Sequence, residues 1–176
     1  SLVGSEMCIR DRFSGYLVID GPPSGYRHYE LLDFIGVSVW QDLEVRKDAT
    51  VDELKAAFDA YFDGEVKEIY ETYGKPVVIT QFAYPSIDGG ANQLPYISAH
   101  DEDDPSITLD LEEQARIYEA AFRSIAEREW IVGFIPFGYS YLDLPESKDE
   151  SIRGKPAENV LAAYYLAFGE VSGELS

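Results

Sequence analysis

Short apolar runs alternate with longer amphipathic segments along the chain. Four runs are apolar nearly throughout and are rich in β-branched or aromatic residues, at positions 15–20, 33–40, 75–84 and 130–141. Continuous apolar runs of this length, bounded by turn-forming residues such as the GPPSG after the first, are typical of buried strands. The pattern therefore predicts four strands.

Between and after these runs, apolar residues recur at helical spacing in three segments. Residues 50–74 begin with a Thr-x-x-Glu capping box, and we expect this helix to bend or break near Gly64 and to stop at Gly74. Two further helices are expected at 109–129 and 155–168.

The alternation of strands and helices predicts an α/β fold. Strands that are apolar on both faces are typical of a parallel sheet covered by helices. The link at 20–33 is short for a parallel crossover, so we expect a brief helix at 26–32. No linker or low-complexity tract divides the chain, which is expected to form one domain or part of one.

The amino-acid composition disfavours several classes of binding partner. The formal net charge of -19 repels phosphate backbones and anionic lipid surfaces, which argues against nucleic acid and membranes as partners. No phosphate-binding glycine loop is present, and His28 and His100 are solitary, so no cofactor or metal is expected. With 45% hydrophobic residues the chain can build a core, and a neutral ligand fits best.

Residues 2–12 resemble a translated sequencing adapter, because they read back through the genetic code as the end of a transposase adapter. We therefore treat 1–12 as non-native, and expect a native domain at 13–170 with a tail at 171–176. The native N-terminus is expected upstream. The only cysteine, Cys8, lies in this segment and says nothing about compartment, which stays open between secreted, periplasmic and other locations.

Functional groups of parallel α/β sheets gather at the carboxyl ends of the strands. The candidates for ligand binding at these ends are Asp20, Trp40, Tyr84, Tyr139 and Tyr141. Aromatic rings stack on the C–H faces of a sugar while carboxylates and amides bind its hydroxyls, so the set favours a neutral saccharide. Each residue also has a structural explanation, as core packing for the rings and as a turn residue for Asp20.

Four phrases resemble the last four strand–helix units of a (β/α)8-barrel glycoside hydrolase: DFIGVSVW, YGKPVVITQFAYPSIDGG, EQARIYEAAFRSIAEREWIVGFIPFGYSYLD and GKPAENVLAAYY. The resemblance is to the clan of retaining enzymes that includes the β-mannanase-like family 113. It implies a partial TIM barrel, strands 5 to 8, as an open, curved parallel sheet with helices outside. It also implies a missing amino-terminal half as partner, and a neutral β-linked oligo- or polysaccharide as ligand or substrate.

In such enzymes the strand that follows Gly-Lys-Pro ends in Thr-Glu, and the glutamate attacks the anomeric carbon. The matching position in this chain is Gln81. Retention needs two carboxyl groups roughly 5–5.5 Å apart, and a carboxamide is not a nucleophile of that kind. The acid/base partner comes from the fourth strand, which is expected upstream of residue 13, so catalysis stays open.

Three explanations for Gln81 remain. The protein is a non-catalytic saccharide binder, or the codon was misread, or it is a hydrolase whose second carboxylate comes from elsewhere, for which the candidates are Asp20, Asp88 and Asp143. A barrel end used for a protein partner is an alternative from a different class. If the protein binds or hydrolyses a saccharide, we expect Trp40, Gln81 and Tyr139 to surround one ligand.

Overall fold

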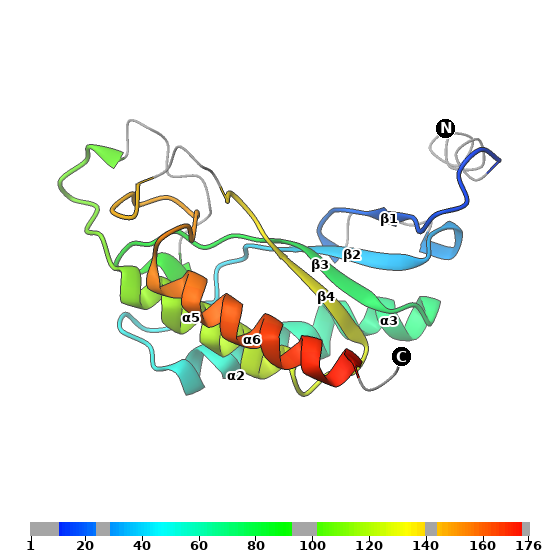
Figure 1. Cartoon of the computed structure of the whole chain (residues 1–176). Helices are drawn as coiled ribbons and strands as arrows, with labels where there is room; N and C mark the ends of the chain where they lie inside the picture. The colour runs from blue at the N-terminus through cyan, green and yellow to red at the C-terminus, as the bar shows by residue number, and fades with distance from the viewer. Residues whose placement is uncertain (1–10, 24–28, 93–101, 140–143, 174–176) are drawn as a thin grey trace.

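The computed structural model describes residues 11–23, 29–92, 102–139 and 144–173. Within these ranges one parallel sheet runs in chain order (Figure 1), with strands β1 (Val18–Ile19), β2 (Phe34–Val39), β3 (Val77–Phe82) and β4 (Ile131–Pro136). The prediction of an α/β fold with a parallel sheet is confirmed. The last strand ends at Pro136, short of the predicted position 141.

The helical elements are η2 (Tyr29–Leu31), α2 (Val51–Tyr61), η3 (Phe62–Val66), α3 (Lys67–Tyr73), η4 (Gly90–Asn92), α5 (Leu111–Ile125) and α6 (Pro156–Gly173). Thr50 and Glu53 form the expected capping box of α2. Where a bend was expected near Gly64, the chain widens into the π-helical turn η3 and continues as α3. Gly74 ends this segment in the left-handed conformation, with φ of 64°.

Two predicted helices differ in extent. The described part of the short link between β1 and β2 contains only the 3-10 turn η2, and residues 26–28 of the expected brief helix lie outside the described residues. The closing helix α6 runs to Gly173, beyond the expected end at 168.

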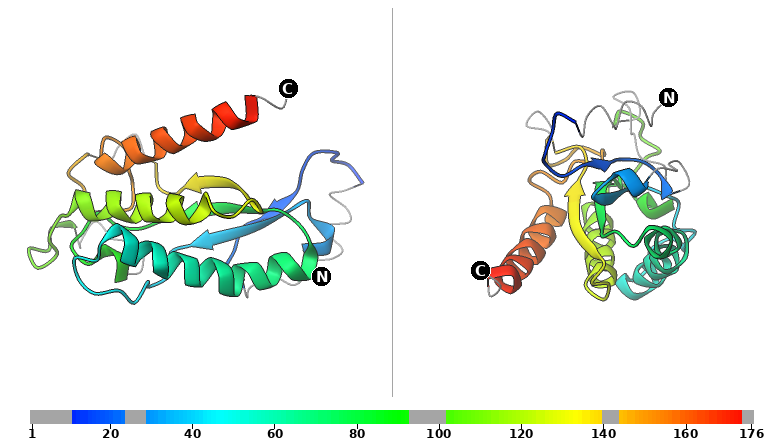
Figure 2. Two further views of the ribbon diagram at one scale, coloured as in Figure 1. Left: turned by 90° about the horizontal axis from the view of Figure 1, so that it is seen from below. Right: turned by 90° about the vertical axis from the view of Figure 1, so that its right-hand side faces the viewer.

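The helices lie together on one side of the sheet (Figure 2). The strand residues that point to this side are fully buried, and they are Ile35, Val37, Val39, Val77, Ile79 and Phe82. Phe58 of α2 and Tyr118 of α5 pack on Phe82, with ring centroids 5.8 and 4.8 Å away. Burying one such side chain contributes about 1.5–3 kcal/mol, so this side of the sheet holds the core.

The opposite face of the sheet carries exposed apolar side chains. Phe134 of β4 packs on Phe122 of α5 at 4.7 Å between centroids, so its neighbour Ile135 points away from the helices. Ile135 is 52% exposed and Val18 on β1 46%. The sheet is therefore open, with one face unpacked in the described part of the chain.

Candidate functional site

A β-bulge aims two consecutive residues of β3 at one side of the sheet. The strands β2 and β3 pair in regular register as far as Ile79, but Ser38 then pairs with Gln81, so Thr80 is an extra residue. A bulge interrupts the alternation of side chains and re-aims them. As a result both Thr80 and Gln81 reach Asp20, which follows β1.

Asp20 is the centre of a hydrogen-bonded group at the carboxyl ends of three strands. Ser38 Oγ donates to Asp20 Oδ1 at 2.6 Å, and Thr80 Oγ1 donates to the same oxygen. Gln81 Nε2 donates to Asp20 Oδ2 at 2.5 Å. The structure thus brings together two of the predicted site residues, Asp20 and Gln81. We call Asp20, Ser38, Thr80 and Gln81 the Asp20 cluster.

The Asp20 cluster holds one carboxylate, and no cation of the described residues forms an ion pair with it. A carboxylate offers roughly four acceptor sites, of which Asp20 uses three. Gln81 Oε1 is buried and has no hydrogen-bond partner in the same part of the chain. The cluster can therefore accept hydrogen bonds from hydroxyl donors, while the engaged Asp20 is less available for nucleophilic attack.

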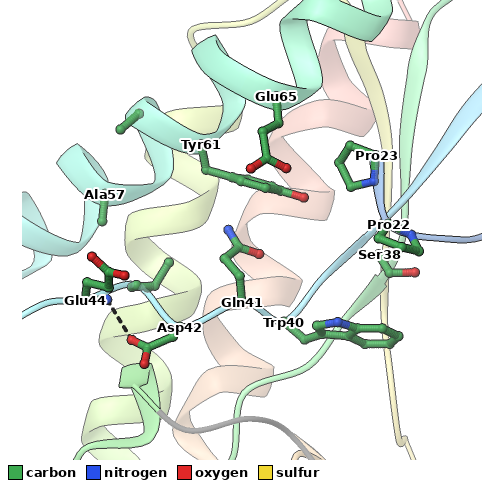
Figure 3. Close-up of a pocket in the computed structure, with 12 residues that line it drawn as sticks. Pro22, Pro23, Ser38, Trp40, Gln41, Asp42, Glu44, Ala57, Tyr61 and Glu65 are labelled. Carbon is green, nitrogen blue, oxygen red and sulfur yellow. Dashed lines mark hydrogen bonds between the residues drawn. The ribbon is translucent and has the colours of Figure 1, made fainter. Parts of the chain in front are cut away.

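Trp40 lines a cavity of about 420 Å³ (Figure 3). Its walls come from the chain after β1, the chain after β2 and one face of α2 and η3, and they include Pro22, Pro23, Gln41, Asp42, Tyr61 and Glu65. Ser38 belongs both to this wall and to the Asp20 cluster, so the two features adjoin. The volume lies in the range of ligand pockets, roughly 300–1,000 Å³.

The described wall of the Trp40 cavity contains carboxylates and no cation. Asp42, Glu44 and Glu65 line it, and Asp42 Oδ1 accepts a hydrogen bond from the backbone N–H of Glu44 at 2.8 Å. Burial, aided by Glu65, raises the pKa of Tyr61 well above its ordinary value, so its hydroxyl stays neutral. Such a wall accepts hydrogen bonds from neutral hydroxyl groups and disfavours anions.

Tyr84, a candidate for ligand binding, lies in the packed core of the described residues. Its side chain is fully buried against Phe58 and Phe82, with centroids 6.0 and 5.1 Å away. The hydroxyl donates to the backbone carbonyl oxygen of Gln41 at 3.0 Å, and burial raises its pKa strongly. Tyr84 therefore supports the chain segment that forms the cavity wall.

The hydroxyl of Tyr139 is hydrogen bonded to a residue of α6 and not to a residue of the Asp20 cluster. The hydroxyl donates to Glu158 Oε1 at 2.7 Å, in the first turn of α6, and this hydrogen bond raises the pKa of Tyr139. Among the described residues no hydrogen bond joins Tyr139 to the Asp20 cluster, and the expectation that Trp40, Gln81 and Tyr139 surround one ligand stays a prediction. The other two candidates from this loop, Tyr141 and Asp143, lie outside the described residues.

Asp88 is held in an ion pair in the loop after β3. Its Oδ2 lies 2.6 Å from Lys47 Nζ. The buried carboxylate of Glu113 fastens the same loop by accepting hydrogen bonds from the backbone N–H groups of Gly89 and Ala91, at 2.9 and 3.2 Å. Within the described ranges no hydrogen bond or ion pair joins Asp88 to the Asp20 cluster, so only Asp20 among the described carboxylate candidates contacts Gln81.

Among the residues that the structure describes, no three His, Cys, Asp or Glu side chains are arranged to hold a metal ion. No described helix combines the length and apolar character needed to cross a bilayer.

The sequence model of Glycoside Hydrolase Family 113 matches residues 8–151. The chain belongs to glycoside hydrolase family 113. The resemblance predicted from the strand phrases is confirmed. No curated protein matches the chain.

Solved structures of family 113 share the fold of this member. The β-mannanase AaManA from Alicyclobacillus acidocaldarius, in complex with ManMIm, superposes with a TM-score of 0.67 at 22% identity, covering 94% of this chain and 49% of its own. A second family 113 β-1,4-mannanase gives 0.66 at 22%, covering 92% and 48%. A β-D-glucuronidase of Dictyoglomus thermophilum gives 0.59 at 15%, covering 91% and 27%.

The chain therefore spans about half the length of the mannanases that it matches. At these identities the likeness shows the fold alone, and the prediction of a partial TIM barrel is confirmed.

Sequence reasoning missed two members of the Asp20 cluster. Ser38 had one usable signal, because it is the polar residue of an apolar run and lies two positions before Trp40, on the same strand face. Thr80 had none, because strict alternation would have put it on the face opposite to Gln81. The bulge alone brings Thr80 to Asp20.

Proposed function

We propose that this family 113 chain provides the carboxyl-terminal half of a barrel that binds a neutral, β-linked, mannan-type saccharide at its strand ends. The observation that carries this proposal is the Asp20 cluster beside the Trp40 cavity. Together they offer a ring for stacking, buried acceptors and uncharged donors. The two family 113 structures described as β-mannanases support mannose as the sugar.

Charge favours a neutral sugar over an acidic one. The glucuronidase that shares the fold acts on a sugar acid, whose carboxylate needs a cation or several N–H donors. The described wall of the Trp40 cavity has three carboxylates, Asp42, Glu44 and Glu65, and no Lys or Arg. The whole chain adds a net charge of -19. A uronic acid is therefore disfavoured here.

Gln81 favours binding over retaining hydrolysis. Its position matches the family's nucleophile in the resemblance, yet an amide carries no charge and forms no glycosyl ester. The nearest carboxylate, Asp20, has three of its roughly four acceptor sites engaged. In this proposal the protein holds saccharide without forming a covalent intermediate.

The exposed apolar face is the surface on which the amino-terminal half of the barrel packs in this proposal. Val18 and Ile135 are each about half exposed, and β4 is an edge strand in the described sheet. Closing a barrel removes such edges and fills the interior with side chains.

The two tryptophans of the chain allow a matched binding test. Trp130→Phe leaves Trp40 as the only indole, and titration with mannohexaose should change its fluorescence in a saturable way. Trp40→Phe leaves Trp130, which stacks on Tyr70 at 5.1 Å before β4 begins and should not respond. A charged glucuronide oligomer should give no response in either variant. Equal responses from both tryptophans, or none from Trp40, would contradict the proposal.

A second measurement separates binding from hydrolysis. Incubation with mannohexaose should release no reducing ends. If reducing ends appear and Asp20→Asn abolishes them, a carboxylate other than residue 81 performs the chemistry, and the non-catalytic part of the proposal is wrong.

A further inference from the structure

We propose that Asp20 is a positioning residue that restricts position 81 to an amide. Asp20 Oδ2 lies 2.5 Å from Gln81 Nε2, where the amide donates and the carboxylate accepts. An ionised glutamate at position 81 would put an oxygen in place of that nitrogen, and two carboxylates at such a distance cannot both stay charged. The inference goes beyond saccharide binding and depends on the hydrogen bonds of Asp20, not on a ligand.

Asp20 is not free to turn away from position 81. Its other oxygen, Oδ1, accepts hydrogen bonds from Ser38 Oγ at 2.6 Å and from Thr80 Oγ1. Ser38 is only 3% exposed, so it has few alternative partners in water. Rotation of the Asp20 carboxylate would break both bonds. Residue 81 must therefore supply a donor, either an amide or a protonated acid.

The described residues around Asp20 offer no positive charge to relieve a second carboxylate. The strand-end residues that contact Asp20 are uncharged, namely Ser38 of β2 and Thr80 and Gln81 of β3. The titratable groups described in the adjoining cavity are Asp42, Glu44, Glu65 and Tyr61. The acids among them add to the repulsion, and all are left unchanged in the variants below.

The contact between Asp20 and Gln81 predicts what happens when a glutamate is placed at position 81. Gln81→Glu alone yields two carboxyl groups that share a proton, not an ionised glutamate. Adding Asp20→Asn reverses the roles, because the new amide can donate to the new carboxylate. In the double variant the carboxylate is therefore at position 81 of β3 and the amide at position 20 after β1, and the hydrogen bond between the two side chains is kept.

The test is a four-variant cycle on the full chain: parent, Gln81→Glu, Asp20→Asn and the double variant. The melting temperature of each is measured at about pH 5 and about pH 8. The like charge raises the pKa of the new glutamate above its unfolded value of about 4.3, so folding stability falls as pH rises through this window. We expect Gln81→Glu to lose about 2–4 °C more than the parent between the two pH values, and the double variant to lose no more than Asp20→Asn alone.

Thr80→Val is the matched control, because it removes one donor to Asp20 without adding a charge. It should lower the melting temperature equally at both pH values. The proposal is overturned if Gln81→Glu matches the parent at both pH values, or if its extra loss persists in the double variant. Should Gln81→Glu fail to fold at all, a folded double variant supports the proposal and an unfolded one overturns it. Saccharide binding does not enter this cycle, so its absence would count only against the proposed function.

Discussion

The two faces of the sheet are built from the same strands and differ in almost every other respect. Toward the helices, Phe82 of β3 has no exposed surface and lies among aromatic rings. On the other face, Gln81, its direct neighbour, is hydrogen bonded to Asp20, and Ile135 of β4 is about half exposed. Adjacent residues of one strand thus contribute separately to core packing and to a polar hydrogen-bonded cluster.

The difference between the two faces of the sheet indicates where amino-acid substitutions are tolerated. The helix side has few voids, so the loss of atoms there leaves a cavity and costs folding free energy. The other side has polar groups whose partners can be exchanged, provided donors and acceptors still match. We therefore expect a substitution at residue 81 to keep the fold only where the new side chain still donates a hydrogen bond to Asp20.

The largest effect is expected for Phe82→Ala. Its ring contacts Phe58, Tyr84, Tyr118 and Phe134, so its removal should cost about 3–5 kcal/mol of unfolding free energy. Urea denaturation measures the loss.

The control for that variant lies on the exposed face. Ile135→Ala should change the unfolding free energy of the chain by about 0.5 kcal/mol or less, because the side chain is 52% exposed. Comparable losses for the two variants would mean that the two faces do not differ as described. Packing of another half barrel on this face would make the Ile135 variant costly as well.

A smaller loss is expected for Arg128→Met, which acts within the helix layer. The buried guanidinium donates to Asp59 Oδ1 at 3.0 Å and to Asp63 Oδ2 at 2.6 Å. Burial opposes the ionisation of Asp59, but hydrogen bonds from Lys55 and Ser124, together with Arg128, hold its pKa below the ordinary value. Removing Arg128 should cost about 1.5–3 kcal/mol in urea denaturation.

Lys67→Met is the corresponding surface control. Lys67 Nζ lies 3.9 Å from Glu71 Oε1 and both side chains are exposed, so the loss should be near zero. An Arg128 variant as stable as this control would show that the link from the chain after α5 to α2 and η3 is dispensable.

Sequence patterns predict the strands and helices of the fold, but they do not predict which side chains meet in the candidate site. Apolar runs and the capping box at Thr50 are local signals, and the strands and α2 appear where these signals place them. Tyr84 could not be assigned, because position at a strand end does not say which way a ring points. The contact between Thr80 and Asp20 depends on a bulge between two strands that are far apart in sequence, which no local pattern records.

Tyr84→Phe tests the assignment of this ring to the packed region. The variant loses only the hydrogen bond to the carbonyl oxygen of Gln41, so the unfolding free energy should fall by about 1 kcal/mol. Saccharide titration followed at Trp40 should keep its affinity to within about threefold, since the ring itself stays in place. A large loss of affinity with unchanged stability would return Tyr84 to the list of ligand contacts.

The smallest effect is expected for Glu53→Gln, on the solvent side of the helix layer. The hydrogen bond from Arg46, followed by those from Thr50, lowers the pKa of Glu53 to about 2 from an ordinary 4.5. A lowered pKa contributes stability above the unfolded value and loses it as pH falls through this range, so the parent should lose slightly more stability than the variant between about pH 5 and about pH 2.5. Glutamine keeps the capping box, and the exposed ion pair is screened by water and salt, so the difference should be small and should shrink at high ionic strength.

The control for Glu53→Gln is Glu68→Gln, which removes the same charge from α3. A difference between parent and Glu53→Gln that persists in high salt would mean that Glu53 is less exposed to solvent than its position at the start of α2 implies.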